Sequence, residues 1–98
     1  MMEESVAKIA SWASMGTLEQ FRTEVEARVS KTDYSVEREG NTLLFYRTRK
    51  EGGFLGIGAK TVKEPVMKIV KEGPNVEIPD DPLDPEFVAY LASGLRHH

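Results

Sequence analysis

The residue types that most often perform chemistry in proteins are scarce in this sequence. There is no cysteine, and the only histidines are the last two residues, His97 and His98. The serines have no evident base to activate them; they stand at positions 5, 11, 14, 30, 35 and 93. A nucleophile needs such an activating partner. We therefore expect a protein that is not an enzyme, with no catalytic residue and no cofactor.

The densest acidic cluster is a candidate for binding a hard cation, because carboxylate oxygens are the ligands that such ions prefer. It consists of Asp80, Asp81, Asp84 and Glu86. Its spacing matches no known ligand loop. The alternative is that these carboxylates solubilise a proline-rich connector and cap a helix. We favour the alternative and predict no metal site.

A glycine-rich apolar stretch is the most unusual feature of the chain. Four of the eight glycines fall within residues 52–58, and Phe54, Leu55 and Ile57 lie between them. Successive backbone N–H groups of glycines can cradle a phosphate. The spacing is not that of a nucleotide-binding loop, and the stretch leads into a strand pattern rather than a helix. Apolar side chains on such a loop either pack inward or bind a partner.

We predict that this stretch binds a protein partner or a second copy of the chain. The predicted partner-binding residues are Gly53, Phe54, Leu55, Gly56, Ile57 and Gly58.

The same stretch resembles a known family. Residues 53–60, Gly-Phe-Leu-Gly-Ile-Gly-Ala-Lys, are similar to the Lys-Gly-Phe-Leu-Gly-Ile-Gly signature of the Jag N-terminal domain, a small βαββ module. The resemblance covers roughly residues 17–70, although the family begins with a strand where we expect a helix here. It implies an interaction module with an exposed Phe-Leu-Gly loop. RNA binding in that family belongs to downstream domains, so the resemblance does not imply it for this chain.

Charge is distributed unevenly along the chain. Residues 41–72 carry seven Lys/Arg and three Asp/Glu, whereas the chain as a whole has a net charge of −3. This basic middle predicts where an anionic partner would bind. The candidate anion-binding residues are Arg47, Arg49, Lys50, Lys60 and Lys63. Nucleic-acid or phosphate binding is thus the alternative function, and lysines that merely solvate a strand are the structural alternative.

Composition indicates a folded, water-soluble domain. The 98 residues are 40% hydrophobic and 30% charged, which is typical of one globular domain spanning residues 1–98. No apolar run approaches the roughly 18 residues of a membrane span. The N-terminus is acidic where a signal peptide would be basic. We therefore expect a cytoplasmic protein that does not bind membranes.

Two helices are expected before any strand. Apolar residues follow helical spacing over residues 3–15, with Trp12 extending the stripe. A second helix over 17–30 begins with a capping box, in which Thr17 and Gln20 bond each other's backbone N–H groups. Its apolar stripe consists of Leu18, Phe21, Val25 and Val29. Both stripes predict helices that pack against a common core.

Four strands follow. Residues 33–50 form a predicted hairpin with Gly40 and Asn41 in its turn, a register that places Val36 opposite Phe45. Apolar residues on both faces at 43–46 predict a central strand that is covered on both sides. A third strand is expected at 60–71, and Pro65 within it predicts a bulge or an unpaired edge at that point. A short fourth strand is expected at 76–78.

The chain is then predicted to end in a connector and a helix. Residues 79–85 form the proline-rich connector, with Asp84 as helix cap and Pro85 as the first residue of a helix over 85–95. The element order is ααββββα. The predicted fold class is α+β, with helices packed on one face of a four-stranded antiparallel sheet.

Overall fold

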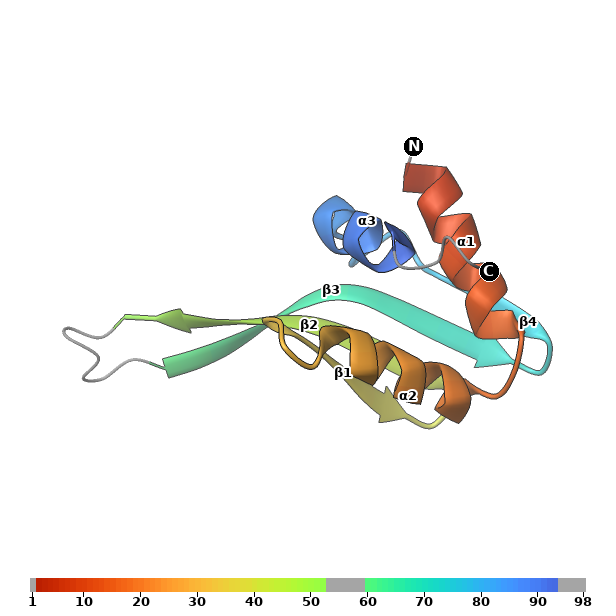
Figure 1. Ribbon diagram of the computed structural model, residues 1–98, viewed down its shortest axis with the longest axis horizontal. Helices are drawn as coiled ribbons and strands as arrows, with labels where there is room; N and C mark the ends of the chain where they lie inside the picture. Colours follow the sequence, from red (N-terminus) through yellow and green to blue (C-terminus); the bar gives the residue numbers. More distant parts are fainter. Residues whose placement is uncertain (1, 53–59, 94–98) are drawn as a thin grey trace.

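A four-stranded antiparallel sheet forms the centre of the fold, with strand order β1-β2-β3-β4 (Figure 1). The structure is a computed structural model, and it describes residues 2–52 and 60–93. The strands are β1 (Tyr34–Glu39), β2 (Thr42–Glu51), β3 (Lys60–Glu72) and β4 (Asn75–Glu77). The helices are α1 (Met2–Ser14), α2 (Leu18–Val29) and α3 (Pro85–Ser93). The predicted α+β class and the order ααββββα are confirmed.

One face of the sheet carries the core. The register places Val36 opposite Phe45 and Phe45 opposite Met67, as the hairpin prediction requires for the first pair. Leu43 and Ile69 form the next inward pair. Because strand side chains alternate between faces, all these residues point to the same side. They form one cluster with apolar residues of the three helices. We call this the inner face.

The other face is not covered by any helix that the structure describes, so the described residues provide only part of the covering that the sequence predicts for this side of β2. The strand is central, but Leu44 and Tyr46 on its outer face are only half-buried. Lysines of β3 shield these two side chains in part. Lys68 pairs with Leu44, and Lys63 lies over the Tyr46 ring. Long lysine stems can cover apolar surface while the ammonium group stays in water.

Helix α2 begins as its sequence predicts. Thr17 Oγ1 accepts the Gln20 N–H at 3.1 Å, and Gln20 Oε1 accepts the Thr17 N–H at 3.0 Å. This reciprocal pair satisfies two backbone donors that the first turn leaves without partners. The predicted apolar stripe of α2 is buried in full. Each such side chain contributes about 1.5–3 kcal/mol by leaving water.

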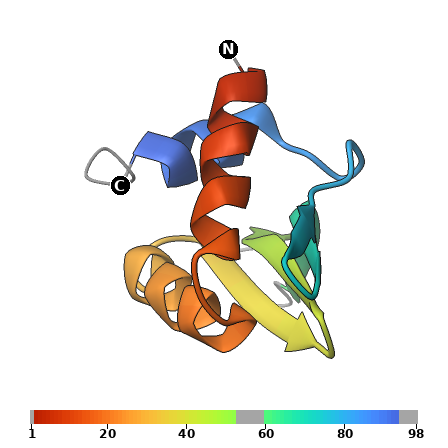
Figure 2. The ribbon, with the colours of Figure 1, turned by 90° about the vertical axis from the view of Figure 1, so that its right-hand side faces the viewer.

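Helices α1 and α3 complete the layer over the inner face. Helix α1 contacts both α2 and α3, and α3 also contacts β3 (Figure 2). Trp12 on α1 packs edge-on against Phe21 on α2, with ring centroids 4.7 Å apart. Phe87 on α3 packs against Phe45 of the sheet, with ring centroids 5.4 Å apart. Aromatic contacts thus join α1 to α2 within the helical layer and α3 to the sheet.

The connector ends as predicted. Asp84 Oδ1 accepts the Glu86 N–H at 3.0 Å, and Pro85 is the first residue of α3. The Asp84 N–H donates to the Val66 carbonyl at 2.8 Å, and Leu83 forms a bridge with Met67. The connector therefore lies along the edge of β3 and carries the chain from the sheet to the last helix.

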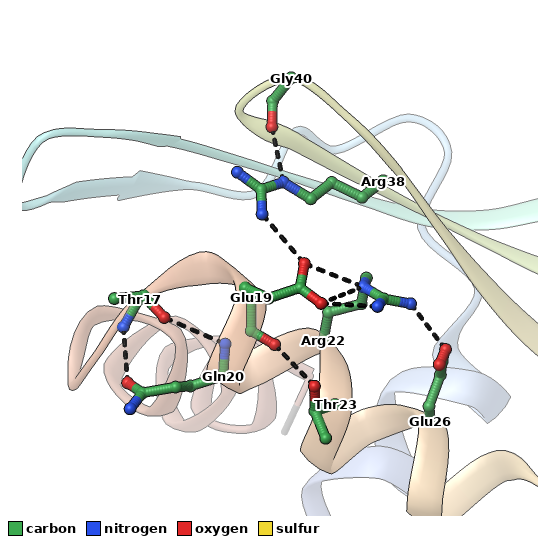
Figure 3. Close-up of polar contacts among 8 residues, drawn as sticks. All are labelled: Thr17, Glu19, Gln20, Arg22, Thr23, Glu26, Arg38 and Gly40. Carbon is green, nitrogen blue, oxygen red and sulfur yellow. Dashed lines mark hydrogen bonds and ion pairs between the residues drawn. The ribbon is translucent and has the colours of Figure 1, made fainter.

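A polar cluster fastens α2 to the β1–β2 turn (Figure 3). Glu19 accepts hydrogen bonds from Arg22 on its own helix and from Arg38 on β1. Arg38 also donates to the Gly40 carbonyl at 2.8 Å, and Gly40 has φ +60°. These bonds connect residues 19 positions apart in the chain. They hold the exposed end of the hairpin against the start of α2.

Candidate functional site

Beyond the helices, β2 and β3 continue as a two-stranded arm (Figure 1). We define the arm as residues 46–51 of β2 and 60–65 of β3, which pair from Tyr46–Pro65 to Glu51–Lys60. Strand β1 pairs with β2 only as far as Arg47. One residue further, the Thr48 N–H donates to the Asp33 carbonyl. On the other edge, β4 pairs only with residues 70–72 of β3. In the part of the chain that the structure describes, no strand flanks residues 49–51 or 60–64.

A β-bulge separates the arm from the body of the sheet. Phe45 pairs with Met67, whereas its neighbour Tyr46 pairs with Pro65, so Val66 is an extra residue in β3. The sequence predicted a bulge at this proline, and that prediction is confirmed. Val66 is buried, and its carbonyl accepts the connector's Asp84 N–H. A bulge bends the strand that contains it and increases its twist. The bulge therefore lies where the arm leaves the core.

The inner face of the arm holds two arginines against one glutamate. Arg47 Nη2 lies 3.2 Å from Glu64 Oε1, and Arg49 Nη2 lies 3.2 Å from Glu64 Oε2. The hydrogen bond to Glu64 raises the pKa of Arg47 above its ordinary value, and the charge of Asp84 adds to this effect. Arg47 is therefore cationic at any physiological pH. One carboxylate between two guanidinium groups leaves a net positive charge on this face.

The outer face of the arm holds lysines around a tyrosine. Lys63 Nζ lies 2.5 Å from Glu37 Oε2 on β1 and 5.6 Å from the centroid of the Tyr46 ring. The hydrogen bond to Glu37 raises the pKa of Lys63 above its ordinary value. Lys50 shares this face because it stands four residues after Tyr46 on the same strand. The arm thus exposes cations on both of its faces.

All five basic residues that the sequence nominated lie on the arm. Arg47, Arg49 and Lys60 fall on the inner face, and Lys50 and Lys63 fall on the outer face. Lys50 and Lys60 are exposed and form no ion pair with another described residue. Their positions in the sequence alone group these residues into one basic segment. The pairing register instead divides them between two faces.

Two acidic residues of the site were missed by sequence reasoning. Glu64 and Glu37 contact three of the five nominated cations. The sequence signal for Glu64 was Pro65, because the one-residue bulge beside it shifts the register of β2 with β3 and places Glu64 opposite Arg47. Glu37 pairs diagonally across strands with Lys63, which no local pattern indicates.

The six nominated residues of the glycine-rich stretch lie outside the described residues. They are Gly53, Phe54, Leu55, Gly56, Ile57 and Gly58. The prediction that they bind a partner stays a prediction.

A second surface feature is a hollow of about 600 Å³ between the end of α1 and the start of α2. Its apolar lining includes Trp12, Phe21 and the exposed Met15. Its polar lining includes Glu24, which accepts a hydrogen bond from Trp12 Nε1 at 3.0 Å. This lining supplies no histidine or cysteine, so it offers no nucleophile–base pair of the usual kind.

Neither metal binding nor membrane insertion is visible in the described residues. Within residues 2–52 and 60–93, no three carboxylate, imidazole or thiol groups lie close enough together to hold a metal ion. The acidic cluster at 80–86 instead provides the cap of α3. None of the described helices is long and apolar enough to span a bilayer.

Comparison with known proteins gives no relative from which a function could be transferred. The chain matches no family model, no curated protein and no solved structure. The geometry of the arm is therefore the basis for a proposed function.

Proposed function

We propose that this chain is a non-enzymatic interaction domain that binds an anionic partner through the β2–β3 arm. The observation that supports this proposal is the exposure of cations on both faces of a ribbon that leaves the core. Arg49 is about half-exposed, with a side-chain exposure of 49%, and Lys63 has 53%. Partly exposed cations on a protruding element can reach a partner without any change in the fold.

The distribution of charge supports an anionic partner. The chain contains 13 Lys/Arg and 16 Asp/Glu. Residues 46–64 contain five of these basic residues and only two of the acidic ones. The rest of the sequence therefore holds eight basic and fourteen acidic residues. A body of this charge repels an anionic partner, whereas the arm attracts it. Such segregation steers a partner to one end of the molecule.

Pairing of two arms edge to edge is disfavoured by the same charges. An open strand edge is a template for another strand, and lysines along an edge are a common means of preventing such pairing. Two arms side by side would bring Lys60 and Lys63 of each copy close to those of the other. A symmetric dimer through the arms would therefore bring like charges together.

A second copy of the chain remains a candidate partner through its acidic connector. Asp84 already lies close enough to Arg47 to raise the pKa of that arginine. The connector of one copy could take the same place beside the arm of another. We also propose that Phe54 and Leu55 of the glycine-rich stretch contribute to self-association or to partner binding. Phe54→Ser with Leu55→Ser should reduce that association if it is correct.

Retention on an immobilised polyanion such as heparin tests the proposal directly. The double variant Arg49→Glu with Lys50→Glu should elute at clearly lower salt than the unmodified protein. The matched control is Lys8→Glu with Lys31→Glu, which changes the net charge equally but alters two exposed residues of the body. Equal shifts for both variants would mean that the arm is not the binding surface.

A further inference from the structure

We infer that the anionic partner is B-form duplex DNA, and that the β2–β3 arm enters its major groove. This inference rests on the proposed function and adds the partner class and the way in which it is bound. The observation behind it is the two-faced distribution of cations: Arg47 and Arg49 point to one side of the ribbon, and Lys50 and Lys63 point to the other.

Charges on both faces suit a partner that surrounds the arm. A flat anionic surface would contact one face and leave the cations of the other face in solvent. A groove of duplex DNA has a phosphate backbone along each wall. A ribbon within it can direct the inner-face arginines to one backbone and the outer-face lysines to the other. Phosphate contacts of this kind position a protein on DNA.

The dimensions of the arm agree with those of the groove. The major groove of B-form DNA is about 12 Å wide and about 8.5 Å deep, and it admits a two-stranded β-ribbon. The arm comprises six residue pairs, from Tyr46–Pro65 to Glu51–Lys60. At about 3.3 Å per residue, it is roughly 20 Å long. It can therefore span the groove while the acidic body stays outside.

Single-stranded nucleic acid fits the arm less well. Proteins that bind single strands without sequence preference stack the bases on exposed aromatic rings. Tyr46 is the one aromatic residue in the described part of the arm, and Lys63 lies over its ring at 5.6 Å. Duplex RNA also fits less well, because its major groove is deep and narrow and excludes such elements.

An acidic peptide that adds a strand to the edge of β3 is the competing macromolecule. Strand addition draws its specificity from pockets for alternate side chains. The edge available for such a strand is residues 60–64 of β3, Lys-Thr-Val-Lys-Glu, and Val62 is their only apolar member. Pro65 also provides no N–H at the end of this edge. The edge therefore offers charge but no apolar pocket, which favours a partner recognised by its phosphates.

Fluorescence anisotropy with four probes tests the inference on the full chain. The probes are a mixed-sequence DNA duplex of about two helical turns, its single strand, the matching RNA duplex and poly-L-glutamate. We expect the DNA duplex to bind most tightly. Its affinity should fall between about 50 mM and about 200 mM salt, with a log–log slope of about −4 if four or five cations contact phosphates.

Variants of each face test whether both backbones are contacted. Arg49→Gln on the inner face and Lys50→Gln on the outer face should each reduce the salt slope by about 1. The control Lys31→Gln, on the body, should leave the slope unchanged. Circular dichroism of each variant verifies that the fold is retained. If only one of the two arm variants changed the salt slope, only one face would contact phosphates, and insertion into the groove would be overturned.

The outcomes separate this inference from the proposed function. Arm-dependent binding of poly-L-glutamate without binding of duplex DNA would overturn the inference and leave the proposed function intact. Tighter binding of the single strand or the RNA duplex would do the same. Absence of binding to all four probes at low salt would overturn both.

Discussion

Arg47 on β2 and Glu64 on β3 stand directly opposite each other, with Arg47 Nη2 3.2 Å from Glu64 Oε1. The second carboxylate oxygen of Glu64 contacts Arg49 at 3.2 Å. One residue thus holds both arginines of the inner face and cancels part of their charge. Glu64 consequently sets how strongly this face attracts an anion.

Replacing Glu64 by glutamine should strengthen binding of duplex DNA. The change removes one negative charge between two guanidinium groups and keeps the size of the side chain. Partly exposed ion pairs contribute about 0–1 kcal/mol, so we expect an affinity gain of roughly two- to fivefold and little change in stability. Anisotropy at low salt measures the gain. Glu72→Gln, outside the arm, is the control, and an equal gain there would show only a general effect of net charge.

The acid sensitivity of the fold should depend on Glu19. Hydrogen bonds from Arg22, and then from Arg38, lower the pKa of Glu19 from 4.5 to about 2 in the folded protein. A carboxyl group whose pKa is depressed by folding stabilises the fold above its unfolded pKa. That stabilisation is lost as the pH falls from about 4.5 towards about 2.

Glu19→Gln should therefore flatten the decline of stability with acid in that window. Thermal melting of both proteins between neutral pH and pH 2 provides the comparison. The two curves should differ most near neutral pH and converge at the acid end. Parallel curves would contradict the assigned role of Glu19. Glu72→Gln, which replaces an exposed carboxylate that is not a member of this cluster, is the control.

Removing the capping box should destabilise the fold by about 1 kcal/mol. Thr17→Ala loses the hydroxyl that accepts the Gln20 N–H at 3.1 Å, and such substitutions cost about 0.5–2 kcal/mol. Thr17→Ser keeps the hydroxyl and should retain most of the stability. Urea unfolding measures both. A loss as large in the serine variant would assign the effect to the methyl group instead of the cap.

The features that could be predicted from the sequence are those set by local chemistry and short-range periodicity. Thr17 and Gln20 define a cap within four residues, and Gly40 fixes the hairpin turn and hence the register of β1 and β2. Asp84 and Pro85 define the start of α3 in the same way. Pro65 indicates a bulge because it cannot donate a backbone hydrogen bond. The fold class follows from these elements and their order.

The candidate site was predictable only in part, because it depends on pairings between distant residues. The five basic residues were evident from their type, but their division between two faces follows from the register of β2 with β3. Assigning each residue to a face requires the position of the bulge in that register to be known to within one residue. The contact of Lys63 with Glu37 joins residues 26 positions apart on strands that are not adjacent in the sheet. No pattern among neighbouring residues of the sequence indicates this contact.

Two adjacent residues of β2 should differ sharply in their contribution to stability. Phe45 is 1% exposed and packs against Phe87 of α3, whereas Leu44 lies on the uncovered outer face and is half-buried. Phe45→Ala leaves a cavity in the core and should cost about 3–5 kcal/mol. Leu44→Ala removes a side chain that water already reaches, so its cost should be about 1 kcal/mol or less.

Urea unfolding of the two alanine variants measures this difference. Phe45→Leu should recover much of the stability, because it refills most of the volume with an apolar side chain. A Leu44→Ala variant as unstable as Phe45→Ala would require that the outer face be buried in solution. The surface that buries it would then be a second copy of the chain or another partner, and sedimentation of the unmodified protein at several concentrations would distinguish the two. In that case the outer-face lysines of the arm would lie beside an existing interface, which would leave less of this face accessible to DNA.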